Sequence, residues 1–221
     1  MAVQSILLYG APIWQRAMET NKYKDIMKST QRVMVLRICG AFRTVSYDAA
    51  MVIAGMIPIH ILAEERKELY QNSTTDKTER VKTREITFIK WQEEWQSATK
   101  GRWTYRLIGN IKPWATRKWG QVSYQMCQFL SEHGCFMKYV AAIEKRGNGK
   151  CMYCDSEDDS EHIFFHCHKW DDERNNLQEK IHTKLRVENL VDKMLGSEEN
   201  WKMIEEFMTK IIGQKEKDER N

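Results

Sequence analysis

Residues 151–167 read CMYCDSEDDSEHIFFHC, and this stretch decides how the surrounding chain can fold. It carries three cysteines and one histidine in the spacing C-x2-C-x7-H-x4-C: Cys151, Cys154, His162 and Cys167. Thiolates and a neutral imidazole are the usual ligands of structural Zn²⁺, and a Cys-x2-Cys pair brings two sulfur atoms to one ion across a tight turn. The motif therefore predicts one tetrahedral zinc site, in preference to free thiols and a histidine that merely packs.

The fourth ligand has a second interpretation, because His166 lies next to Cys167. On a regular α-helix His162 and His166 share one face, whereas a residue at i+5 points away, so helix geometry favours His166. Thiolate is the softer and stronger ligand, however, and a tightened last turn would bring Cys167 to the ion. We therefore place Cys167 first and His166 second. With four protein ligands the site is closed, which indicates an ion that orders the chain and leaves no position for a catalytic water.

The composition is that of an ordinary folded protein, and 221 residues suffice to bury a substantial core. The apolar run from Ile6 to Tyr9 is too short for a signal peptide or a membrane span. We therefore expect a soluble, intracellular protein with no membrane partner. The cysteines outside the motif lie in apolar, helix-like surroundings and are expected to be buried, reduced thiols: Cys39, Cys127 and Cys135.

The net charge of +4 conceals an uneven distribution. Counting Lys and Arg against Asp and Glu, residues 1–75 have nine against six, residues 76–150 have fifteen against seven, and residues 151–221 have eleven against eighteen. The middle third is therefore the basic one.

Helical patterns dominate the chain, and no strand pair or internal repeat is evident, so the expected fold class is mainly α. Apolar residues at Ile26, Val33 and Leu36 predict an amphipathic helix over 23–41. Ser46 is a good N-cap for a short helix to Ala54 that Gly55 closes. Further helices are expected over 58–69 with Pro58 at the first position, over 80–98, up to about 132 with a stop at Gly134, over 136–145, over 169–181, and from Ser197 onward.

Polar residues 71–77 are the expected linker, and residues 214–221 are expected to fray. Between them, residues 100–119 mix cations and aromatic rings most densely. Such a mixture can bind nucleic acid, because cations neutralise phosphates and rings stack on unpaired bases. It also arises when amphipathic helices bury tryptophans and leave charges in water, and composition alone favours this second interpretation.

Several motifs resemble one protein family. They are LLYGAPIW (7–14), Gln31-Arg32, Leu36-Arg37, AFRTVS (41–46), VIAGMIP (52–58), GRWT (101–104), HGCF (133–136) and the Cys-Cys-His-Cys knuckle followed by Trp170. In this order, over roughly residues 3–175, they resemble the region after the palm in reverse transcriptases of non-long-terminal-repeat (LINE-like) retrotransposons. The likeness is strongest to arthropod elements that insert into ribosomal DNA.

The resemblance implies a C-terminal part of such a reverse transcriptase, an RNA-directed DNA polymerase used in target-primed reverse transcription. It implies thumb-like helices over 1–71, a basic helical connection over 79–148, a zinc knuckle and following helix over 149–182, and C-terminal helices over 183–221. It also implies an RNA template, a target DNA and an upstream polymerase palm as partners, and a nuclear location during integration. The expected nucleic-acid contacts are Arg102, Trp103, Arg106, Lys112, Arg117 and Lys118.

The catalytic parts of the family have no counterpart among these residues. Polymerisation needs carboxylates that hold Mg²⁺ in an aromatic-Ala-Asp-Asp turn. The pairs Asp158-Asp159 and Asp171-Asp172 lack that context, and no Pro-Asp element of the restriction-like endonuclease follows residue 167. Structural zinc is therefore the one cofactor expected here, with Mg²⁺ confined to the palm, and no catalytic residue is assigned. The alternative is a non-catalytic, zinc-stabilised protein-interaction module from a decayed element, and a zinc hydrolase is disfavoured by the closed site.

Overall fold

The computed structural model describes residues 2–72, 76–144 and 147–220. Within these ranges the chain is helical, and the one β-type contact is an isolated bridge between Lys150 and Glu157. The expectation of a mainly α fold is thereby confirmed. The elements are α1 (Ala2–Leu7), α2 (Ala11–Trp14), η1 (Gln15–Glu19), α3 (Asn21–Ile38), α4 (Tyr47–Ala54), α5 (Ile59–Gln71), α6 (Lys77–Ser97), α7 (Arg102–Leu107), α8 (Ile111–Ala115), α9 (Tyr124–Ser131), α10 (Met137–Glu144), η2 (His162–His166), η3 (His168–Trp170), α11 (Asp171–Lys180), α12 (Val187–Gly196) and α13 (Glu198–Asp218).

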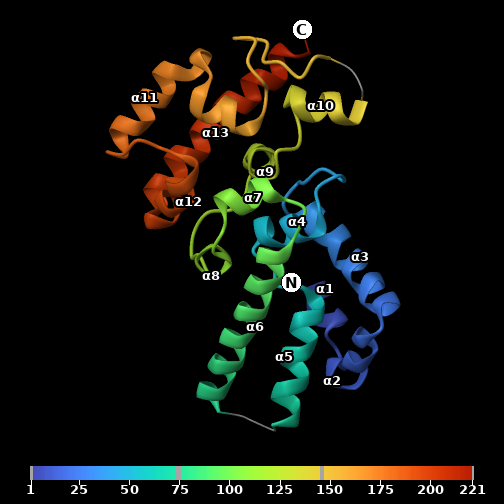
Figure 1. The fold of residues 1–221 in the computed structure, drawn as a ribbon. Helices are drawn as coiled ribbons and strands as arrows, with labels where there is room; N and C mark the ends of the chain where they lie inside the picture. The colour runs from blue at the N-terminus through green and yellow to red at the C-terminus, as the bar shows by residue number, and fades with distance from the viewer. Residues whose placement is uncertain (1, 73–75, 145–146, 221) are drawn as a thin grey trace.

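The helices form an elongated body with the candidate metal site near one end (Figure 1). Helices α5 and α6 lie side by side at the other end, and α2, η1 and α3 pack along α5. Helices α4, α7 and α9 occupy the middle, and α13 packs on α9, α11 and α12. One continuous cluster of buried apolar residues runs from Val35 in α3 to Ile212 in α13. The division of the chain into four functional parts stays a prediction.

Three helix ends form as the sequence predicts. The Ser46 hydroxyl accepts a hydrogen bond from the Ala49 amide at 3.3 Å, and the Ser197 hydroxyl accepts one from the Asn200 amide at 3.0 Å. Gly55 ends α4 with φ of 64°, in the left-handed region that favours glycine. Pro58 differs by one position, because it precedes the first helical residue.

The end of α9 differs from the prediction that Gly134 supplies the left-handed turn. Glu132 takes that conformation, with φ of 59°, and closes the helix. Gly134 is needed for a different reason. A Cβ atom there would lie 1.8 Å from Oε1 of Gln128, whose side chain crosses the turn. The glycine therefore permits close packing instead of ending the helix.

The C-terminal region is more ordered than expected. Helix α13 continues to Asp218, and Lys215 is fully buried, so fraying from residue 214 is wrong. Helix α12 lies within residues 183–221, where helices were expected without individual bounds before Ser197, and residues 100–119 form two short helices, α7 and α8. Of the predicted linker 71–77, residues 73–75 lie outside the described ranges. So do residue 145 of the helix predicted over 136–145, residue 146, and the chain's first and last residues.

Helix α3 has two apolar faces, where the sequence predicted one. Gln31, Val35 and Leu36 face the core, but Ile26 and Val33 are 53% and 52% exposed. The prediction that placed Ile26 and Val33 on the same face as Leu36 is therefore wrong. The helix carries an apolar stripe on its outer side as well.

The three cysteines outside the metal-binding motif lie in the core. Cys39, Cys127 and Cys135 are buried free thiols, as predicted.

No single helix in the described ranges is long and apolar enough to span a membrane. Only α4 and α5 taken together, across a bend of 64°, reach that length and composition, and both helices bury most of their apolar residues.

Candidate metal centre and neighbouring basic surface

A short, tightly hydrogen-bonded turn presents the first two cysteines. The amide of Cys151 donates to the Ser156 carbonyl at 2.7 Å, and the amide of Asp155 donates to the Cys151 carbonyl at 3.0 Å. Asp155 adopts a left-handed conformation with φ of 59°, which reverses the chain directly after Cys154. The turn therefore points the two sulfur atoms toward the same side.

A π-helical turn presents the other two candidate ligands. Element η2 has i to i+5 hydrogen bonding, and the amide of Cys167 donates to the His162 carbonyl at 2.8 Å. A π turn is wider than an α turn, so residues five apart come onto one side. Cys167 therefore joins His162 through a widened turn, and the tightened turn expected from the sequence is wrong. His166 is exposed and lies outside the cluster.

The four ligand atoms of Cys151, Cys154, His162 and Cys167 lie within 4.8 Å of one another, the one such metal-binding group in the described ranges. The Sγ atoms of Cys151 and Cys167 are 3.8 Å apart, and those of Cys154 and Cys167 are 4.0 Å apart. Nε2 of His162 lies 3.1 Å from Sγ of Cys154. Ligands about 2.3 Å from a central ion at tetrahedral angles are separated by roughly 3.8 Å. The cluster could therefore hold a metal ion.

Burial and hydrogen bonding act in opposite directions on the pKa values of the three candidate cysteine ligands. Burial alone would raise the pKa of Cys154, but the amide and hydroxyl of Ser156 donate to its sulfur and hold that pKa below its ordinary value. Burial raises the pKa of Cys167 to about 12, although the amide of Lys169 donates to its sulfur. Donors aimed at sulfur favour the thiolate, which is the form that binds metal. Burial also raises the pKa of Cys151, so the donors alone favour the thiolate at Cys154, and a coordinated cation would be needed to deprotonate the other two thiols.

The loop between the ligands is fastened to α13 at two points. Asp158 is fully buried, and its Oδ2 lies 2.8 Å from Nζ of Lys215, which is also fully buried. The same Oδ2 accepts a hydrogen bond from the Met137 amide at 2.8 Å. The Tyr153 hydroxyl donates to Oδ2 of Asp218 at 2.6 Å. Sequence reasoning missed these residues, because nothing in the local pattern pairs residue 158 with residue 215.

Two arginines hold the π turn. Arg174 on α11 donates from Nε to the Phe164 carbonyl at 2.8 Å and from Nη2 to the Cys167 carbonyl at 2.7 Å. Arg106 on α7 forms a two-pronged ion pair with Glu161, with N to O distances of 2.5 and 3.0 Å. The candidate metal centre therefore contacts α7, α11 and α13 through charged side chains.

Two of the six expected nucleic-acid residues serve the core instead. Trp103 is 7% exposed, and its indole N–H donates to the Phe129 carbonyl at 2.7 Å. It offers no free ring face to a base, so the expectation for Trp103 is corrected. Arg117 lies over the Trp114 ring at 4.4 Å and donates to the Trp114 carbonyl at 2.7 Å. Burial lowers the pKa of Arg117.

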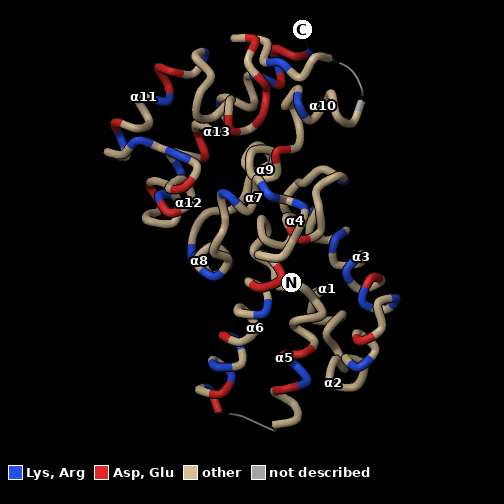
Figure 2. Tube along the Cα trace, in the orientation of Figure 1, with Lys and Arg blue, Asp and Glu red and all other residues tan. Residues whose placement is uncertain are grey.

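The other four are exposed, but two of these are already paired. Arg106 binds Glu161, and Lys112 lies 2.5 Å from a carboxylate oxygen of Glu85 on α6. Figure 2 shows the same mixture along α5 and α6, where basic and acidic segments alternate. The excess of positive charge in the middle third is therefore partly neutralised within the fold.

Arg102 and Lys118 remain without a carboxylate partner in the described ranges. The Arg102 guanidinium lies over the Tyr105 ring at 3.9 Å and donates to the Ala98 carbonyl at 3.0 Å, which leaves its other donors facing solvent. Lys118 is exposed on the segment after α8. These two are the expected contacts that the structure leaves available to phosphate.

Comparison with known proteins supplies the biological context. No protein-family model matches the chain, and no solved structure matches it. A retrovirus-related Pol polyprotein from the type-1 retrotransposable element R1 2 of Nasonia vitripennis is 24% identical over 189 residues, covering 76% of this chain and 45% of that protein. A second, from element R1 of the same organism, is 25% identical over 164 residues, covering 66% of this chain and 48% of that protein.

A third relative, from element R1 of Bradysia coprophila, is 22% identical over 187 residues, covering 75% of this chain and 18% of that protein. The homologues of this chain are arthropod R1 retrotransposon polyproteins. The resemblance found in the sequence is thereby confirmed. The chain spans about half the length of the first two R1 relatives, so the activities of a whole R1 polyprotein do not transfer to it directly.

Proposed function

We propose that this chain is the zinc-stabilised, nucleic-acid-binding C-terminal part of a retrotransposon reverse transcriptase. It would grip RNA template or target DNA during target-primed reverse transcription in the nucleus, and a polymerase palm elsewhere in the polyprotein would perform the chemistry. The observation that carries this proposal is the four-ligand cluster in a chain homologous to R1 Pol polyproteins.

Zinc is the ion that best suits the cluster. Three thiolates and one imidazole form a soft ligand set with roughly tetrahedral spacing, which favours Zn²⁺ over the oxygen-seeking Mg²⁺ and Ca²⁺. Bound zinc would supply folding free energy and no catalysis, because Cys151, Cys154, His162 and Cys167 fill all four positions. The protein's own residues orient those ligands through the Ser156 amide and the Arg174 guanidinium.

Substitution of the ligands tests the metal assignment. Cys154→Ser removes one thiolate, and structural zinc sites contribute on the order of 10 kcal/mol of binding free energy, so we expect purified Cys154→Ser protein to contain well under one zinc per chain. His166→Ala is the matched control and should keep one zinc, because His166 lies outside the cluster. Elemental analysis by mass spectrometry measures both. Full zinc in Cys154→Ser, or its loss in His166→Ala, would show that the ligand set is wrong.

Binding of single-stranded RNA and DNA tests the proposed grip. Lys and Arg that neutralise phosphates release counterions, and each contact adds about 0.7 to the slope of log K against log salt for a single strand. Arg102→Glu combined with Lys118→Glu should therefore reduce that slope by about 1.4 and weaken binding at low salt. Fluorescence anisotropy with labelled single-stranded RNA and DNA 20-mers, at several salt concentrations, measures the affinity and its slope.

The control for this experiment is Lys180→Glu combined with Lys184→Glu, which makes the same charge change at exposed positions of the acidic C-terminal third. We expect it to retain the slope of the unmodified protein. An equal loss of affinity and slope in both double variants would mean that net charge, and not contact at Arg102 and Lys118, causes the effect. Absence of binding by the unmodified protein would refute the proposed grip.

A second candidate function is the protein-interaction module. The outer face of α3 favours it, because several large apolar side chains there are exposed. This face does not require nucleic acid, and the two functions are compatible in one chain.

A further inference from the structure

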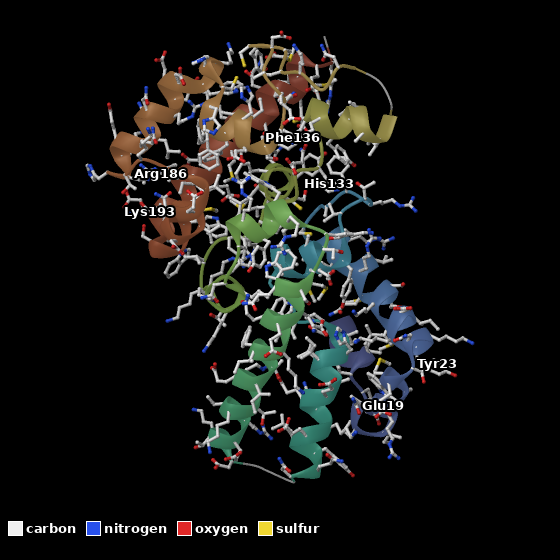
Figure 3. All side chains as sticks on the ribbon, in the orientation of Figure 1. Glu19, Tyr23, His133, Phe136, Arg186 and Lys193 are labelled. Carbon is white, nitrogen blue, oxygen red and sulfur yellow. The ribbon has the colours of Figure 1, made fainter. Side chains whose placement is uncertain are left out.

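The outer side of α3 carries an apolar stripe along its whole length. Tyr23, Ile26, Val33 and Ile38 are 49%, 53%, 52% and 62% exposed, although the opposite side of the same helix is buried in the core. Tyr23 faces away from the other helices (Figure 3). A helix that is apolar on both sides is characteristic of one buried on both sides.

The spacing of the stripe suits another helix. Tyr23, Ile26 and Val33 lie on a line of positions with alternating steps of three and four, which is the seam by which helices pack lengthwise; Thr30 and Arg37 are the polar members of this line, and Ile38 lies beside its end. From Tyr23 to Ile38 the stripe is about 22 Å long, at a rise of 1.5 Å per residue. An amphipathic helix of four to five turns would cover it with apolar residues at i, i+3, i+4 and i+7.

The stripe ends in a hollow between α3, α1 and the end of α4. The cavity has a volume of about 620 Å³, and its lining includes Val33, Met34 and Ile38 of α3 together with Ala54 and Met56. Cavities of roughly 300–1,000 Å³ accept drug-sized groups, so this one can hold large apolar side chains. Methionine in the lining adapts to the shape of what enters.

Positive charge surrounds the stripe. Helix α3 contains five Lys or Arg residues and one acidic residue, Asp25. Arg32 is engaged, because it donates to the carbonyls of Arg43 and Val45. The exposed side chains of Lys22 and Arg37 make no hydrogen bond or ion pair within the part of the chain that the structure describes. Arg37 also lines the cavity, so a carboxylate beside an apolar anchor would find a guanidinium there.

We propose that this face, defined by Tyr23, Ile26, Val33, Arg37 and Ile38, docks an acidic amphipathic helix of a partner protein. Apolar anchors of that helix fill the stripe and the hollow, and Asp or Glu beside the anchors meet Lys22 and Arg37. Nucleic acid fits the face poorly, because Ile26 and Val33 offer neither hydrogen-bond donors for phosphate nor flat rings for bases. The inference is independent of the proposed grip on RNA or DNA.

Selection from two displayed peptide libraries tests the proposal on the full 221-residue chain. Both libraries hold 18-residue helices with apolar residues at i, i+3, i+4 and i+7, flanked by Glu in one library and by Lys in the other. Selected peptides are then measured by fluorescence anisotropy against Ile26→Glu/Val33→Glu protein. The matched control is Val81→Glu/Ile89→Glu, which changes two apolar residues of α6 that are 54% and 58% exposed.

We expect enrichment of the Glu-flanked library, at least a tenfold loss of affinity in the α3 variant and in Arg37→Glu, and none in the α6 variant. Circular dichroism and zinc content should be unchanged in all variants, because the substituted side chains are exposed. Equal enrichment of the two libraries, or equal loss in the α3 and α6 variants, overturns the proposal. A dimer of the unmodified chain that the α3 variant loses would make a second copy the occupant, and loss of duplex RNA binding in that variant would make the face a nucleic-acid site. Either result also overturns the proposal.

Discussion

Lys215 joins the last helix to the loop of the candidate metal centre. Its Nζ contacts Asp158 at 2.8 Å and also contacts Glu219, and the side chains of Lys215 and Asp158 are fully buried. Removing one partner of a buried pair leaves the other charge without compensation, which costs about 3–5 kcal/mol. Lys215→Met should therefore lower the free energy of unfolding by that amount, measured by urea denaturation of the zinc-loaded protein.

A control separates this effect from a general loss of lysine. Lys210→Met removes an exposed lysine whose Nζ lies 3.0 Å from Glu173, and such surface pairs contribute about 0–1 kcal/mol. Adding Asp158→Asn to Lys215→Met removes the buried charge and should recover part of the loss. If Lys215→Met costs no more than Lys210→Met, the buried pair has no structural importance.

At the scale of elements, the segment that follows α8 must pass closely over α13. Gly120 has φ of 79°, and a Cβ atom there would lie 2.2 Å from Cε2 of the buried Trp201 ring. Overpacking costs about 1–3 kcal/mol and a left-handed conformation adds about 1–2 kcal/mol, so Gly120→Ala should destabilise the protein by about 2–5 kcal/mol. Thermal unfolding followed by circular dichroism measures the change.

Gly213 is the matched control on α13. It lies inside the helix, and a Cβ atom there would meet nothing within 4 Å, so Gly213→Ala should stabilise the protein by about 0.5–1 kcal/mol. Destabilisation by both substitutions would mean that the close approach of Gly120 to Trp201 is not the cause.

Local sequence rules located the helix ends that depend on neighbouring residues. Ser46, Gly55 and Ser197 act within three positions of themselves, and each was predicted. The π turn was not predicted, because the spacing of the four ligands does not specify which kind of turn brings Cys167 to Cys151, Cys154 and His162. The four ligands could be identified from spacing alone, whereas Asp158 and Lys215 meet only after the whole C-terminal region has folded.

At the scale of the whole molecule, the charge that is available to a ligand also depends on contacts that form only on folding. Counting along the sequence marks residues 76–150 as basic, yet Arg84 and Lys90 form ion pairs with carboxylates of α5, outside that range, and Lys112 is paired within it. Tertiary pairing therefore decides which cations remain available, and Arg102 and Lys118 are two that do. A linear count overestimates the attraction that this region offers to phosphate.

Removing the metal should loosen α13 together with the knuckle, residues 151–167. Cys151, Phe164 and Cys167 belong to the same buried cluster as Met208 and Ile212 of α13, and Asp158 fastens the loop to that helix. Zinc in the proposed site would give the four ligand groups a common partner, so its removal would take away the binding free energy that holds the loop in place against α13.

Hydrogen exchange with mass spectrometry, before and after treatment with a chelator, measures this coupling. We expect faster exchange at residues 151–167 and over α13, and little change along α5 and α6, which pack with each other at the far end of the molecule. Local stability varies between cooperative units, so a distant helix pair can keep its protection while the metal-dependent unit opens. Faster exchange confined to residues 151–167 would contradict the coupling, because it would mean that the Asp158 to Lys215 contact transmits nothing to α13.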